Sequence, residues 1–192
     1  MNVCVFCGSS MGRRAEYQQV ATALGKAIAK KGYGLVYGGA SVGLMGAVAD
    51  GALKAGGEVI GILPKSLAGL EIAHSGLTEL KIVSSMHERK ALMAELSNAF
   101  IAMPGGIGTL EEAFEIWTWT QLGLHRKPLA LLNTNGFYNK LAVFLDHIVA
   151  EQFVKPDHRD MLIMESDPHA LINQLVHYDP PYIKKWIDKD AT

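Results

Sequence analysis

The chain has 192 residues, 49% of them hydrophobic, and carries a formal net charge of −1. A chain of this length and apolar content can build one domain around a substantial core, and its balanced charge argues against nucleic acid or an acidic membrane as a partner. No apolar run approaches the ~20 residues that a membrane-spanning helix needs, and the N-terminus has no charged leader or cleavage site, so we expect no membrane segment and no signal peptide.

Predicted strands and helices alternate along the first half of the chain. The expected strands cover residues 2–6, 35–37, 58–63 and 78–83. The expected helices cover residues 13–31, the stretch from a glycine-rich bend at 38–46 to residue 55, and residues 86–97. Ser85 and Glu88 predict a capping box at the start of the last of these helices. The segment 65–77 is irregular and long for an α/β connection, so we expect a functional loop there.

The second half of the chain continues the same alternation. The expected elements are strand 98–103, helix 110–122, strand 128–132, helix 138–151, a short strand 161–164, and a helix that begins after Asp167 and ends near residue 177. The strands are continuous apolar runs, which is typical of a parallel sheet covered on both faces. We therefore predict an α/β fold: a single-domain, Rossmann-like parallel sheet flanked by helices on both faces, over residues 1–180, with a C-terminal tail at 181–192.

The bend at residues 104–108 is the first candidate for a functional site. Its glycines allow a sharp turn that exposes backbone N–H groups after the proline ends the strand. A glycine loop that leads into a helix is a ready anion site, because the free N–H groups and the helix dipole both point at the ligand. A structural interpretation is also open, because Thr109 and Glu112 would form a capping box with Thr109 as N-cap.

The second glycine-rich bend, at residues 38–46, also follows a predicted strand. Two such bends at the carboxyl ends of strands predict a ligand crevice along that edge of the sheet. A dinucleotide is not expected, because the turn after the first strand lacks GxGxxG and no acidic residue is placed to hold a ribose hydroxyl. No Walker sequence is present either. We therefore infer a mononucleotide or sugar phosphate as ligand.

The two cysteines, Cys4 and Cys7, form a single CxxC sequence. A redox pair would lie at a strand-to-helix turn, but Cys4 is inside the first predicted strand. An offset of three residues along a strand points the two side chains to opposite faces. We expect reduced structural thiols and, from them, a cytoplasmic setting.

Arg89 is the candidate cation near the phosphate loop. It shares a helical face with Met86 and Met93, and a fixed, always charged fork on such a face suits anion binding. The alternative is a surface salt bridge with Glu88 or Glu95.

Metal and serine-nucleophile chemistry are not expected. None of the seven histidines has HxxxH or HExxH spacing, and no serine lies in a GxSxG elbow. We predict no metal and no cofactor. The remaining set of an arginine, carboxylates and phosphate-binding loops can catalyse displacement at a sugar C1, because carboxylates stabilise an oxocarbenium-like transition state or activate water while a cation anchors the phosphate.

Two motifs carry a resemblance to a known family. Met86-His87-Glu88-Arg89-Lys90, followed by Pro104-Gly105-Gly106-Ile107-Gly108-Thr109-Leu110-Glu111-Glu112, resembles the LONELY GUY (LOG) family of cytokinin-activating phosphoribohydrolases, whose signature is PGGxGTxxE. The likeness covers most of the chain. It implies a modified Rossmann domain and a homodimer with the active site near the subunit interface. It also implies hydrolysis of the N-glycosidic bond of a nucleoside 5′-monophosphate, which releases adenine or an N6-prenylated adenine and ribose 5-phosphate.

The resemblance also implies roles for individual residues. Arg89 and Glu112 match the catalytic pair. We hypothesise that Glu112 positions water or a ribose hydroxyl at the reacting carbon, that Arg89 holds the phosphate and orients Glu112, and that crowding with Glu111 and Glu115 raises the pKa of one carboxylate. The positions that match substrate-binding residues are Glu71, Lys90, Gly105, Gly106, Ile107, Gly108, Thr109, Leu110, Glu111 and Thr118.

Three other functions are compatible with parts of this pattern. Proteins with the motif have been labelled lysine decarboxylases, but that chemistry needs pyridoxal phosphate and a Schiff-base lysine that we cannot identify here. Molybdenum-cofactor carriers resemble this fold and hold a phosphorylated ligand without catalysis, for which the Arg89 and Glu112 pair is unnecessary. A plain AMP nucleosidase without a cytokinin role is the third, because base selectivity depends on the shape of the pocket.

Overall fold

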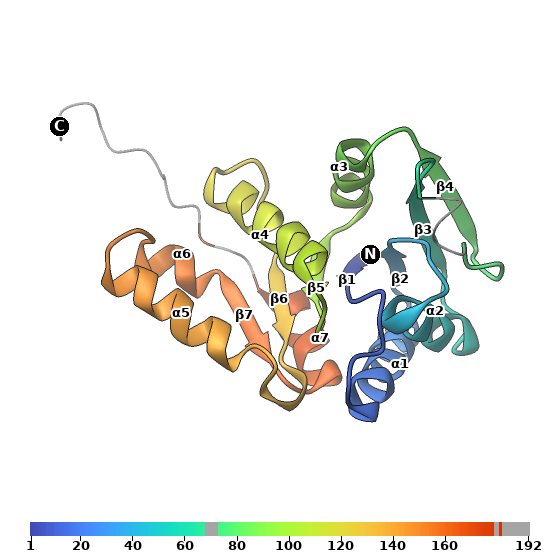
Figure 1. The fold of residues 1–192 in the computed structure, drawn as a ribbon, viewed down its shortest axis with the longest axis horizontal. Coiled ribbons are helices and arrows are strands. Elements are labelled where there is room, and N and C mark those ends of the chain that lie inside the picture. The colour runs from blue at the N-terminus through green and yellow to red at the C-terminus, as the bar shows by residue number, and fades with distance from the viewer. Residues whose placement is uncertain (68–72, 179–180, 182–192) are drawn as a thin grey trace.

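The computed structural model describes residues 1–67, 73–178 and 181. Within these residues, seven strands form one parallel sheet in the order β4-β3-β2-β1-β5-β6-β7 (Figure 1). The strands are β1 (Asn2–Phe6), β2 (Gly34–Tyr37), β3 (Val59–Pro64), β4 (Glu79–Val83), β5 (Ala99–Ala102), β6 (Leu129–Leu132) and β7 (Leu162–Glu165). The helices are α1 (Ala15–Lys30), α2 (Gly43–Lys54), α3 (Met86–Leu96), α4 (Ile107–Gln121), α5 (Asn139–Ala150), α6 (Pro156–Asp160) and α7 (Pro168–His177), with a 3₁₀ turn at Thr134–Gly136.

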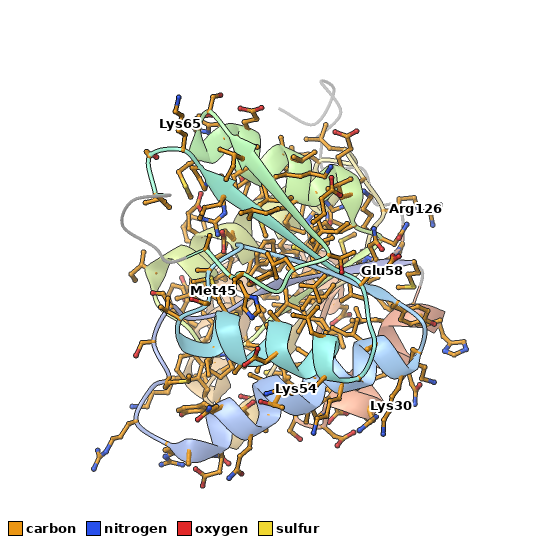
Figure 2. All side chains as sticks on the ribbon, turned by 90° about the vertical axis from the view of Figure 1, so that its right-hand side faces the viewer. Lys30, Met45, Lys54, Glu58, Lys65 and Arg126 are labelled. Carbon is orange, nitrogen blue, oxygen red and sulfur yellow. The ribbon has the colours of Figure 1, made fainter. Side chains whose placement is uncertain are left out.

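Helices cover both faces of the sheet, as the apolar strands predicted. Side chains of α1, α2 and α7 form one buried cluster with one face of the strands, and side chains of α3, α4 and α5 form a second cluster with the other face. Lys30 and Lys54, in the last turns of α1 and α2, remain at the surface (Figure 2). The predicted α/β fold with a parallel sheet between two helical layers is therefore confirmed.

The cysteines follow the alternation of β1. Cys4 packs in the cluster on the α3 and α4 side, whereas Cys7 packs in the cluster on the α1 and α2 side. Both are free and buried. Burial raises the pKa of each thiol, so neither forms a thiolate readily. The predicted opposite orientation of the two side chains is confirmed.

Several element boundaries and two short elements differ from the sequence predictions. The helix α4 begins at Ile107, not at Leu110, and the structure adds α6 and the 3₁₀ turn, which the sequence analysis did not predict. Pro156 at the first position of α6 was the available signal for that helix. The N-cap predictions were right for Ser85, whose side chain accepts from Glu88 N–H, and for Asp167, whose side chain accepts from Ala170 N–H.

The sheet order places a crevice between β1 and β5. The chain leaves β1 toward β2 on one side, and leaves β5 toward β6 on the other. Ligands of open α/β sheets bind at this kind of switch point, outside the carboxyl ends of the strands. Here the loops after the two strands are in contact, because Gly8 N–H donates to the Pro104 carbonyl at 3.1 Å. The fold therefore brings the glycine bend at 104–108 against the first loop of the chain.

A buried tyrosine supports the end of β5, and its removal should weaken the fold. The Tyr138 hydroxyl donates to the Met103 carbonyl at 2.6 Å, and Tyr138 is 1% exposed. Tyr138→Phe leaves that carbonyl without its donor, so we expect a loss of about 1–2 kcal/mol in the free energy of unfolding, measured by urea titration. Tyr178→Phe is the matched control, since its hydroxyl donates to the Asp160 carbonyl at the surface. An equal loss in both variants would contradict this account.

Candidate active site

Two adjoining clefts follow the carboxyl edge of the sheet beside β1 and β5. They share Gly8, Ser9 and Gly106, and their volumes are about 230 Å³ and about 220 Å³. The larger cleft, which we call the catalytic cleft, is lined by Cys7, Gly8, Ser9, Met45, Leu67, Met86, Arg89, Gly106, Gly108, Thr109 and Glu112. The second cleft is lined by Gly8, Ser9, Ser10, Met11, Gly12, Tyr17, Leu44, Pro104, Gly105, Gly106 and Phe137.

The N-terminus of α4 lies between these clefts and has no side-chain cap. Gly106 is the N-cap residue, with extended backbone angles, and helical geometry begins at Ile107. The predicted capping box is therefore wrong: Thr109 is inside the first turn, and Glu112 is on the next turn. With no side chain at the N-cap position to accept hydrogen bonds, the first N–H groups of α4 are left for a ligand.

The three glycines of this bend have different roles. A Cβ on Gly105 would lie 2.1 Å from Thr109 Oγ1 and 2.9 Å from Gly8 N, so glycine is required there by packing within the loop. Among the described residues, no atom lies within 4 Å of a Cβ placed on Gly106 or Gly108, and neither glycine has a positive φ. Both line the catalytic cleft. A side chain at either position would therefore project into the space that a ligand needs.

Arg89 and Glu112 meet in the catalytic cleft from two different helices. Arg89 is on α3 and Glu112 is on α4, and Nη2 of the arginine lies 3.5 Å from Oε1 of the glutamate. Their side chains are 9% and 11% exposed. The alternative of a surface ion pair for Arg89 is wrong, because Glu95 is exposed and Glu88 instead accepts from Ser84 N–H at the start of α3.

The buried guanidinium of Arg89 has a donor without a partner in the described part of the chain. Its Nε has no hydrogen-bond partner among the described residues, and its Nη1 contacts Met86 Sδ at 3.9 Å. A buried guanidinium normally uses its five donors, because an unpaired buried donor costs free energy. Arg89 is therefore arranged to receive oxygen atoms of an anionic or polar ligand in the cleft.

Burial raises the pKa of Glu112 to about 7, and this increase is opposed by the positive charge of Arg89. The nearby carboxylate of Glu111 raises the pKa further, while the ammonium of Lys90 lowers it. The predicted rise in a carboxylate pKa is confirmed, but burial is its main cause rather than crowding. A carboxyl group that titrates near neutral pH can exchange protons with a substrate or with water, which is what general acid–base catalysis requires.

Lys90, the residue after Arg89 on α3, also forms ion pairs with α4. Its ammonium pairs with Glu111 and, at 3.0 Å, with Glu115. The neighbouring residues Arg89 and Lys90 on α3 thus face Glu112 and Glu111 on α4. The ammonium of Lys90 is engaged with α4, and Lys90 does not line either cleft.

The other predicted substrate-binding residues divide into two groups. Gly105, Gly106, Gly108 and Thr109 line the clefts, whereas Ile107, Leu110, Glu111 and Thr118 do not. Thr118 is exposed and donates its hydroxyl to the Phe114 carbonyl. Leu110 lines a small apolar cavity between α4 and the sheet. Glu71 lies outside the described residues.

Several residues of the clefts were not selected from the sequence. Gly8 and Ser9 follow the first predicted strand. That position, at the carboxyl edge of the sheet, could have identified them as ligand-binding candidates. Leu67, Tyr17 and Phe137 carried no such signal. The rings of Tyr17 and Phe137 meet edge to face with centroids 6.0 Å apart, although the residues come from opposite halves of the chain.

Metal-binding clusters and membrane-spanning helices are both absent from the part of the chain that the structure describes. Over residues 1–67, 73–178 and 181, no cluster of three or more His, Cys, Asp or Glu side chains could hold a metal ion. Over the same residues, no helix combines the length and apolar character needed to cross a bilayer.

Comparisons with known proteins identify the proteins that this chain resembles. A family model described as "Possible lysine decarboxylase" matches residues 45–175. A cytokinin riboside 5′-monophosphate phosphoribohydrolase from Rhodococcoides fascians is 52% identical over 172 residues, which cover 89% of this chain and 87% of that protein. The cytokinin riboside 5′-monophosphate phosphoribohydrolase LOG of Oryza sativa subsp. japonica is 48% identical over 180 residues, which cover 94% of this chain and 74% of that protein.

Among solved structures, the molybdenum cofactor binding protein of Rippkaea orientalis matches with a TM-score of 0.70 and 24% identity, over 91% of this chain and 94% of that one. At this identity the likeness shows a shared fold. The relatives described above are much more similar in sequence, and the family model spans most of the chain. On these similarities, the chain belongs to the LOG family of cytokinin riboside 5′-monophosphate phosphoribohydrolases.

Proposed function

We propose that the protein hydrolyses the N-glycosidic bond of a nucleoside 5′-monophosphate, either AMP or an N6-prenylated AMP, and releases the base and ribose 5-phosphate. The observation that carries this proposal is the buried pair of Arg89 and Glu112, with an unpartnered arginine Nε and a carboxyl pKa of about 7, beside the uncapped N-terminus of α4. The relatives from Rhodococcoides fascians and Oryza sativa carry this activity in their names.

The phosphate would lie at the N-terminus of α4, over Gly106 and Gly108. Free N–H groups and the helix dipole favour an anion there, and the missing side chains leave room for it. Glu112 is one turn further along the same helix. The reacting C1′ atom of the ribose would then lie near the Glu112 carboxyl, with the Arg89 guanidinium on ribose or phosphate oxygens.

In the reaction, the C1′–N bond breaks with its electron pair on the base, and a water oxygen bonds to C1′. Ionised Glu112 would accept a proton from that water, and the departing base nitrogen would be protonated from solvent. The positive charge that develops on the sugar ring is stabilised by the same carboxylate. Arg89 would hold the substrate in register with Glu112, which is a positioning effect as well as an electrostatic one.

Incubation with AMP and separation of the products by liquid chromatography tests the proposal. We expect adenine and ribose 5-phosphate in equal amounts, and a panel of AMP, GMP, CMP and isopentenyl-AMP would define the base preference. A nucleotide or molybdenum-cofactor carrier would bind its ligand without releasing a base. The lysine decarboxylase alternative is not supported, because among the described residues no lysine lines either cleft, and pyridoxal phosphate needs a Schiff-base lysine.

The pH dependence of the reaction should report on Glu112. Because its pKa is raised to about 7, the carboxyl is protonated at lower pH and cannot accept a proton from water. We therefore expect kcat/KM for AMP to fall as pH decreases through about 7, measured by steady-state kinetics. Lys90→Met should move this limb to higher pH, because the charge of Lys90 lowers the pKa of Glu112 while Glu111 and Glu115 raise it. A flat profile between pH 5.5 and 8.5, a range of about 1.5 units to either side of that value, would exclude Glu112 as the base.

We also propose that the protein is a cytoplasmic homodimer with the active site near the subunit interface. Ile107, at the start of α4, is 82% exposed beside the catalytic cleft, and Leu122 at the other end of the helix is 38% exposed. Thr118 is exposed on the same helix, so it would reach substrate from a neighbouring subunit more readily than within its own. Residues 1–180 would act as one nucleotide-binding domain, with 181–192 as a tail.

A further inference from the structure

The glycine-rich bend at 38–46 was expected to bind ligand, but its first glycine does not line either cleft. Gly38 follows β2 directly and is buried. Its φ is not positive, so its backbone conformation does not require glycine. Glycine is instead required at this position because a larger side chain would overlap with a neighbouring group, and that group is the guanidinium of Arg89.

Arg89 lies where a side chain on residue 38 would be. A Cβ on Gly38 would be 2.4 Å from Arg89 Nη2 and 3.4 Å from Cζ of the same guanidinium. Met45 Sδ would also be close to this Cβ, at 3.1 Å. The Nη2 atom that meets this position is also the atom that faces Glu112 at 3.5 Å. The end of β2 therefore forms one wall of the slot that holds the guanidinium.

We propose that Gly38 is a positioning residue for the reaction: the absence of a side chain at the end of β2 fixes the Arg89 guanidinium opposite Glu112. This inference rests on the proposed function for its kinetic consequence. The geometry itself is independent of it. Met45 and Met86 contact the same slot, and Met86 Sδ lies 3.9 Å from Nη1, so the guanidinium is confined on several sides.

A methyl group at position 38 would move the guanidinium rather than the backbone. Ordinary contacts of a Cβ begin near 3.4 Å, so Nη2 must retreat by about 1 Å from its present 2.4 Å. It is the far end of a flexible side chain, which can move at low cost in stability. A displacement of about 1 Å in a catalytic group can reduce the rate roughly a hundredfold. The expected defect is therefore catalytic and not a loss of folding.

The test is a double-mutant cycle in kcat/KM for AMP. Gly38→Ala should reduce kcat/KM roughly tenfold to a hundredfold. In the background of Arg89→Lys, which has no Nη2, the same glycine change should have less than about a threefold effect, because the group it displaces is gone. Gly76→Ala is the control for a glycine replacement, since its Cβ meets the His74 ring at 3.3 Å and is outside the clefts. Equal effects of Gly38→Ala in both backgrounds would overturn the proposal.

The pH profile gives a second readout that a purely structural defect would not change. Among the described residues, the charged and titratable groups around the Glu112 carboxyl are Arg89 and Lys90 from α3, Glu111 and Glu115 from α4, and the thiols of β1 and its loop. Arg89 lowers the pKa of Glu112. Gly38→Ala changes the distance between that charge and the Glu112 carboxyl, so the acid limb of the profile should shift. An unshifted limb would mean that the guanidinium had not moved.

A crystal structure of Gly38→Ala separates this proposal from the proposed function. Displacement of the Arg89 guanidinium would support the positioning role even if wild-type protein released no base from AMP, a result that would overturn only the hydrolase assignment. An unmoved guanidinium would overturn the positioning role whatever the activity. If Gly38→Ala fails to fold, thermal unfolding of Gly38→Ala with Arg89→Met decides: restored folding identifies the clash with the guanidinium, and continued failure contradicts it.

Discussion

Glu112→Gln should reduce kcat/KM for AMP roughly a thousandfold or more while the protein remains folded. Loss of a general base costs on this scale, because the amide keeps the shape of the carboxyl but cannot accept the proton of the attacking water or balance charge on the ribose. The Glu112 side chain is buried on the first turns of α4, so the near-isosteric amide fits the same volume.

Steady-state release of adenine measures this effect, and a circular dichroism spectrum establishes that the variant is folded. Glu95→Gln is the control, because Glu95 is exposed on α3 and lines neither cleft. The acid limb of the pH profile should disappear in any residual activity of Glu112→Gln. A variant with a rate near that of the wild type would remove Glu112 from the reaction and leave the carrier function as the better account of the site.

Arg89→Met should reduce kcat/KM for AMP roughly a hundredfold to a thousandfold, with part of the loss in KM. Methionine keeps the apolar stem of the side chain but removes the donors that a ligand would fill. It also removes the charge that lowers the pKa of Glu112, so the remaining activity should require a higher pH. Isothermal titration with AMP would show the weakened binding separately from the loss of turnover.

The control for this variant is Arg159→Met. Arg159 also pairs with a carboxylate, since its Nε lies 2.9 Å from Asp146 Oδ1, but the pair joins α6 to α5 away from the clefts. Its replacement should leave kcat/KM unchanged and cost less than about 1 kcal/mol in stability. If Arg89→Met and Arg159→Met had equally small effects on the rate, the arginine in the cleft would have no part in catalysis.

Much of the architecture was predictable because strands in a covered parallel sheet are apolar on both faces. The first strand was predicted with the bounds it has, and the alternation of strands and helices gave the fold class. The start of α4 was misplaced because Thr109 and Glu112 match a capping box, whereas glycine at the true N-cap carries no side-chain signal. The short helix α6 was missed for lack of any apolar period over so few residues.

Arg89 and Glu112, which the structure brings together, were both singled out from their motifs, but their surroundings were not predictable. The contacts of Lys90 with Glu111 and Glu115 depend on how α3 lies against α4, which no local pattern specifies. The same holds for Gly38, whose neighbour Arg89 comes from a different part of the chain. Sequence spacing predicts which face of one helix a residue occupies, while contacts between helices are fixed by the packed core.

The sheet order has a consequence for how the chain matures during its synthesis. The strand β1 is made first but lies in the middle of the sheet, and its backbone meets Asn98 across a separation of 96 residues. A nascent chain leaving the ribosome can pair β1 with β2 early, yet the other edge of β1 stays open until β5 emerges. An unpaired apolar strand edge can associate with other chains. This protein is therefore most prone to aggregation during synthesis, after β1 and β2 have formed and before β5 has emerged.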